Sequence, residues 1–118
     1  MISRRVIFVL ALGAGLAALG PQVACAQQQQ YLEEAIAETK EAIAAGKQSL
    51  SSSFVEHVDV AYDRARSAVW QNPVESIRKG IKALRKATKL AKGTNSEKRM
   101  AKATEQAEFA LQQFESAR

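Results

Sequence analysis

The chain has few of the residues from which catalytic and metal sites are built. Its 118 residues include one cysteine, one histidine, one tryptophan and two prolines. A single thiol cannot close a disulfide within the chain, and a single histidine cannot supply the paired imidazoles of a typical copper or zinc site. The sequence also lacks a Gly-rich phosphate loop and a nucleophile elbow. It therefore predicts a protein that is not an enzyme.

Long apolar runs are also scarce, and the one that exists lies near the N-terminus. Arg4 and Arg5 precede an apolar run over residues 6–20, and the small residues Ala24-Cys25-Ala26 follow it. This order predicts a secretory signal peptide over residues 1–26, cleaved after Ala26. The alternative is a lipoprotein signal with lipid on Cys25, but Gln22 stands where that signal has a large aliphatic residue. We expect a periplasmic or secreted protein with no thiol and no membrane span after cleavage.

The charges are unevenly distributed along the chain. The 17 basic residues include Arg4 and Arg5, so the expected mature chain has 15 basic and 12 acidic residues, a net charge of +3. Residues 31–45 carry four glutamates and one lysine, whereas residues 73–92 carry seven basic residues and only Glu75. The sequence therefore predicts one acidic and one strongly basic segment.

Apolar residues recur at steps of three and four after a polar spacer over residues 27–30, which predicts four amphipathic helices over residues 31–118. The first helix ends at Gly46, and the third ends at Gly93. The second, third and fourth helices begin at the cap residues Ser53, Asn72 and Thr94. No segment alternates with the period of a β-strand.

The second half of this alanine-rich region resembles the first. Ala35-Ile36 and Ala42-Ile43 match Gly80-Ile81 and Ala87-Thr88 at an offset of 45, and the later helices match at an offset of 42. This pattern predicts a duplicated helical hairpin. Short connections favour an all-α, antiparallel up-down-up-down four-helix bundle. The alternative is two hairpins that pair between chains.

The segment YLEEAIAETKEAIAAGK over residues 31–47 resembles the opening helix of the small metal-binding protein family, and residues 80–82 and 106–116 resemble its later helices. Members of that family are exported four-helix bundles whose histidines bind copper, nickel or zinc. The resemblance implies the same fold, compartment and weak divalent-metal binding or buffering. At positions where the family carries histidines this chain holds other residues, among them Tyr31, Glu38 and Lys79.

The candidate metal ligands are therefore His57 and two rows of carboxylates. His57 has no ligand partner at helical spacing, so its site would need a residue from another helix. The carboxylates recur at steps of three and four, a pattern that could hold a divalent cation loosely or could be an ordinary solvated face. The two rows are Glu34, Glu38 and Glu41, and Glu56, Asp59 and Asp63.

The basic segment supports a second hypothesis, a helical interaction module without metal. Four basic residues follow steps of four, three and four, opposite the apolar stripe of their helix: Arg78, Lys82, Arg85 and Lys89. Such a stripe could bind an anionic surface, an acidic protein or another copy of the chain. In an up-down bundle the acidic first helix and the basic third helix lie diagonally, so their charges could pair only between chains. Export and the absence of a binding motif argue against nucleic acid.

Overall fold

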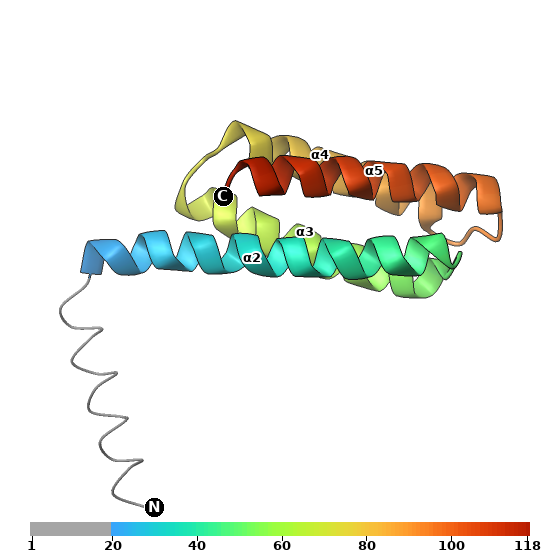
Figure 1. The fold of residues 1–118 in the computed structure, drawn as a ribbon, viewed down its shortest axis with the longest axis horizontal. Helices are drawn as coiled ribbons and strands as arrows, with labels where there is room; N and C mark the ends of the chain where they lie inside the picture. The colour runs from blue at the N-terminus through green and yellow to red at the C-terminus, as the bar shows by residue number, and fades with distance from the viewer. Residues whose placement is uncertain (1–19) are drawn as a thin grey trace, which may run out of the picture.

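The computed structural model describes residues 20–118. Its helices are α2 (Gly20–Lys47), α3 (Ser51–Gln71), α4 (Glu75–Ala91) and α5 (Glu97–Ser116). Consecutive helices run antiparallel, α2 and α4 each pack against α3 and α5, and α2 lies diagonally across from α4 (Figure 1). The predicted all-α four-helix bundle is confirmed. Residues 1–19, most of the predicted signal peptide, lie outside the described residues.

Within residues 20–118, none of the helices combines the length and the apolar character needed to cross a membrane.

The core consists of the apolar stripes that the sequence predicts. In α3 the five buried residues recur at steps of three and four, as the predicted helical face requires: Phe54, Val58, Ala61, Ala65 and Ala68. Most of the buried hydrophobic residues of the bundle are alanines, which bury little area each but let the helix axes approach closely. The larger buried side chains, led by Phe54, Phe114 and Leu32, therefore contribute most of the apolar surface removed from water.

The structure is consistent with the duplicated hairpin. Ala35 and Ala42 in α2 are buried, and so are Gly80 and Ala87, which match them in α4. Val58 in α3 and Met100 in α5, matched at the offset of 42, are also both buried. The α2–α3 and α4–α5 hairpins thus place equivalent positions in one shared core.

The first helix differs from the prediction at its N-terminal end. Residues 27–30, predicted as a spacer, belong to α2. The side-chain amide of Gln28 donates to the carbonyl oxygens of Asn72 at 2.9 Å and Ala68 at 3.3 Å. The carbonyl oxygen of Asn72 follows the end of α3, where helical partners run out, and that of Ala68 also accepts from the backbone N–H of Asn72. The polar run is therefore part of the packed structure.

All three predicted N-terminal caps are wrong, and two of them, Ser53 and Asn72, belong to α3 or its C-terminal end. Ser53 lies inside α3, which begins at Ser51 after Leu50. Asn72 is the C-cap of α3, where its backbone N–H donates to the carbonyl oxygen of Ala68, and α4 begins two residues after Pro73. The hydroxyl of Ser51 instead donates a hydrogen bond to the carbonyl oxygen of Ala91 at 2.5 Å, so it satisfies a carbonyl at the C-terminal end of α4.

The remaining boundaries shift by a few residues. The N-cap of α5 is Ser96 and not Thr94. The hydroxyl of Ser96 accepts a hydrogen bond from the backbone N–H of Arg99. Gly93 follows the end of α4 with a φ of 69°, as a helix-terminating glycine should. Gly46 lies inside α2 and is buried, and its lack of a side chain makes room for α5. The residue with a left-handed conformation after α2 is Ser49, with a φ of 56°.

Candidate functional site

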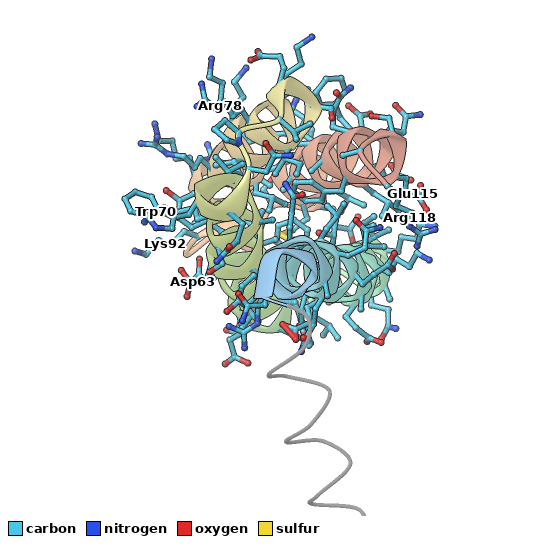
Figure 2. All side chains as sticks on the ribbon, turned by 90° about the vertical axis from the view of Figure 1, so that its left-hand side faces the viewer. Asp63, Trp70, Arg78, Lys92, Glu115 and Arg118 are labelled. Atoms are coloured by element: carbon cyan, nitrogen blue, oxygen red, sulfur yellow. The ribbon has the colours of Figure 1, made fainter. Side chains whose placement is uncertain are left out.

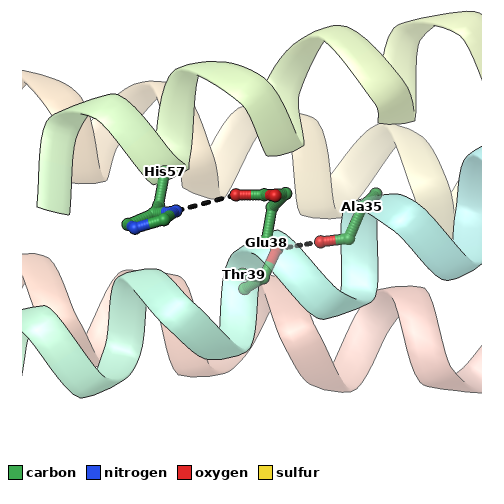
Figure 3. A network of polar contacts seen from close by, with 4 residues as sticks. All are labelled: Ala35, Glu38, Thr39 and His57. Carbon is green, nitrogen blue, oxygen red and sulfur yellow. Dashed lines mark hydrogen bonds and ion pairs between the residues drawn. The ribbon is translucent and has the colours of Figure 1, made fainter. Parts of the chain in front are cut away.

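The only histidine of the chain lies beside a carboxylate from the neighbouring helix. His57 in α3 and Glu38 in α2 face one another, with 2.7 Å between Nδ1 and Oε1 (Figure 3). Their side chains are 35% and 33% exposed, so the pair lies at the rim of the core and is open to solvent. The sequence predicts that a second metal ligand beside His57 would have to come from another helix. Glu38 comes from another helix, but it contacts His57 as a hydrogen-bond partner.

The contact determines which imidazole nitrogen is available to a ligand. An ionised carboxylate only accepts hydrogen bonds, so the Nδ1–H group of His57 donates a hydrogen bond to Oε1 of Glu38. In the neutral ring, Nε2 then carries the free lone pair. A histidine that binds a metal through one nitrogen commonly donates to a carboxylate through the other, and this bond orients the ring. The His57–Glu38 pair therefore has the arrangement of a single metal ligand and its orienting partner.

The other carboxylates of the first predicted row have different surroundings. Glu34 forms an ion pair with Arg64 of α3, with 2.8 Å between Oε2 and Nε. Glu41 is exposed. The row thus follows the seam between α2 and α3, where two of its three members contact basic groups of α3, and it does not form a cluster of free carboxylates.

The second row lies on the outside of α3. Glu56, Asp59 and Asp63 are exposed. Among the described residues, no group of three or more histidine, cysteine, aspartate or glutamate side chains converges in a way that could hold a metal ion. The carboxylate rows therefore do not form a multidentate site within residues 20–118.

The four predicted basic residues are all exposed on α4. Arg85 and Lys89 line a shallow depression together with Asp59 and Tyr62 of α3. Within the part of the chain that the structure describes, none of the four forms an ion pair. The row of Arg78, Lys82, Arg85 and Lys89 thus remains available to an external partner, and an acidic residue borders its α3 side.

A comparison with protein families identifies the family of this chain. The sequence model of one family, described as "small metal-binding protein", matches residues 4–117, which is nearly the whole chain. This chain belongs to the small metal-binding protein family. A search of curated proteins gave no match.

For a small metal-binding protein, this chain offers few ligands. His57 is its one histidine, and its single cysteine, Cys25, lies within the predicted signal peptide. Sequence reasoning singled out both His57 and Glu38 but did not pair them. The missing information was the register of the α2–α3 hairpin, which sets residue 38 opposite residue 57.

Proposed function

We propose that this protein is an exported, non-enzymatic member of the small metal-binding protein family that binds or buffers a divalent metal ion weakly through His57. The His57–Glu38 contact is the observation that supports the proposal, because it leaves Nε2 as the ligand atom. Imidazole nitrogen favours copper, nickel and zinc over calcium or magnesium. The metal is the cargo of this protein.

The affinity should be low because a single imidazole would hold the ion. Selective zinc and copper sites use three or four protein ligands. Here water molecules would complete the coordination, so exchange of the ion with solvent should be fast. Weak binding and fast exchange suit a buffering role better than tight storage.

The first experiment is calorimetric titration of the chain from Gln27 to Arg118 with Cu²⁺, Ni²⁺ and Zn²⁺. This stretch contains all the core residues that the structure describes. Saturable binding that is lost in His57→Ala is expected. Binding should also weaken in acid, because protonation of the imidazole removes the lone pair that the metal needs. Absence of heat at millimolar metal, or equal binding by His57→Ala, would refute this function.

A further inference from the structure

Away from the His57–Glu38 pair, the most uneven distribution of surface charge lies around α4 and α5. Helix α4 carries six basic residues and one acidic residue, Glu75. Its two flanks have different neighbours. Arg85 and Thr88 line the depression shared with α3, where Asp59 is also present. At about 100° per residue, Lys79 and Lys86 lie on the opposite flank, toward α5.

The side of α5 that meets α4 is also basic. Arg99 donates from its guanidinium to the carbonyl oxygens of Leu90 at 3.1 Å and Lys89 at 3.2 Å, at the end of α4. Residues at steps of three and four from Arg99 lie on the same side of α5. They include Lys102 and Phe109, and both are exposed.

The acidic residues of α5 lie toward the other side. Glu97 and Glu108 line a depression with Gly46 and Lys47 of α2. Glu115 shares this side of the helix, at a step of seven from Glu108. Viewed along the bundle, Glu115 points out on the side away from Trp70 of α3 (Figure 2). Glu105, the remaining acidic residue of α5, lies at the boundary between the two sides.

The face between α4 and α5 is therefore cationic and carries an exposed aromatic ring. We define the α4–α5 face by Lys79, Lys82, Lys86, Lys102 and Phe109. Phe109 is 44% exposed, at a position where the core does not require an apolar side chain. A phenylalanine among lysines is typical of surfaces that lie in a membrane interface, where the cations meet anionic headgroups and the ring enters the acyl boundary.

We infer that the α4–α5 face binds the surface of an anionic phospholipid bilayer. The combination of cationic side chains and an exposed aromatic ring favours a lipid surface over a second copy of the chain. A second copy could offer exposed acidic residues such as Glu56, Asp59 and Asp63 of α3, whereas Glu33, Glu34 and Glu38 of α2 already pair with basic groups of their own chain. A second copy would not, however, supply a continuous apolar layer beside those charges. A lipid surface supplies unpaired negative charge together with an apolar layer for Phe109. This contact is peripheral and leaves the bundle intact.

Co-sedimentation with vesicles tests the inference. Vesicles of phosphatidylcholine and phosphatidylglycerol should bind the chain from Gln27 to Arg118 at low salt and release it at high salt. Vesicles of phosphatidylcholine alone should not bind it. Each basic residue near an anionic surface contributes substantially, so the double variant K79Q/K86Q should bind on the order of tenfold more weakly. The matched control K40Q/K47Q changes the net charge equally on α2 and should bind as the unmodified chain does. Circular dichroism checks that both variants keep their helices.

The aromatic contribution has its own matched control. Phe109→Ala should weaken vesicle binding, whereas Trp70→Ala should not, although Trp70 is 88% exposed on α3. In a Trp70→Phe background, Phe109→Trp should show a blue-shifted emission on vesicle addition, because the indole enters a less polar layer. In the unmodified chain the emission of Trp70 should stay unchanged.

Three results would overturn the inference. One is the absence of binding to anionic vesicles at low salt. Another is an equal loss of binding in K79Q/K86Q and K40Q/K47Q, which would show dependence on net charge alone. The third is salt-dependent self-association in sedimentation without vesicle binding, which would assign the α4–α5 face to a second copy of the chain.

Discussion

Gly80 of α4 lies directly against the buried ring of Phe114 of α5. A Cβ atom on Gly80 would lie 2.4 Å from Cε1 of that ring and 2.8 Å from Cδ1. Phe114 is fully buried, so any shift of its ring has to take place within the core. The absence of a side chain at residue 80 is therefore what lets α4 and α5 approach around this ring.

This contact predicts the sign of one stability change. In an exposed helix, Gly→Ala stabilises by about 1 kcal/mol through helix propensity. At Gly80 the overlap with Phe114 should reverse this, and Gly80→Ala should destabilise the bundle by about 1–3 kcal/mol, measured by urea unfolding. The penalty should shrink in a Phe114→Leu background, where the ring is absent. A rise in the unfolding midpoint of Gly80→Ala alone would contradict the packing described.

The amide of Gln28 gives a second prediction. It bonds to two carbonyls at the end of α3, whereas the neighbouring Gln29 is exposed and forms no side-chain hydrogen bond among the described residues. Gln28→Ala should therefore lower the free energy of unfolding by about 0.5–1.5 kcal/mol. Gln29→Ala is the matched control and should change it little. Equal effects of the two substitutions would indicate that residues 27–30 act as the spacer that the sequence predicts.

The sequence predicts the helix faces well because burial follows the helical period. Phe54, Val58 and Ala61 lie on one stripe whatever the neighbouring helices do. Side-chain contacts between helices need more information. The His57–Glu38 pair depends on where α2 ends and where α3 begins, and three residues, 48–50, connect those helices. A shift of one residue there would rotate His57 away from the seam.

The helix caps show the same limit at shorter range. Ser51, Ser52 and Ser53 are equivalent as capping residues in isolation, and only the last is followed by glutamate at the capping-box spacing. In the structure α3 begins earlier, with Leu50 at its N-cap and the Ser51 hydroxyl bonded to α4. Tertiary contacts therefore override the local signal, which has no information about the end of α4.

The caps give a third prediction. Ser96 accepts a hydrogen bond from the backbone N–H of Arg99, whereas Ser53 lies within a helix and caps nothing. Ser96→Ala should cost about 1 kcal/mol of stability, and Ser53→Ala should change it much less. Thermal unfolding of both variants by circular dichroism measures the difference. A larger loss of stability in Ser53→Ala than in Ser96→Ala would indicate that α3 begins at Ser53, as the sequence predicts.

The final prediction separates the role of Glu38 from that of a generic carboxylate. Glu38 and Glu34 lie one turn apart in α2, and both pair with basic groups of α3, but only Glu38 contacts His57. If Glu38 orients the imidazole, Glu38→Ala should weaken Cu²⁺ binding by about 10- to 100-fold, because the loss of a partner that orients a ligand has effects of that size. Glu34→Ala removes the same charge from the same seam and should leave the affinity within a few-fold of the unmodified chain.

The imidazole resonances of His57 provide a direct reading of this difference. In nuclear magnetic resonance spectra, diamagnetic Zn²⁺ should shift the resonance of Nε2 more than that of Nδ1, because Nδ1 keeps its hydrogen bond to Glu38. In Glu38→Ala the preference for Nε2 should weaken, since either neutral tautomer is then accessible. Equal losses of affinity in Glu38→Ala and Glu34→Ala would show that the acidic charge of α2 attracts the cation and that the ring of His57 needs no orienting partner.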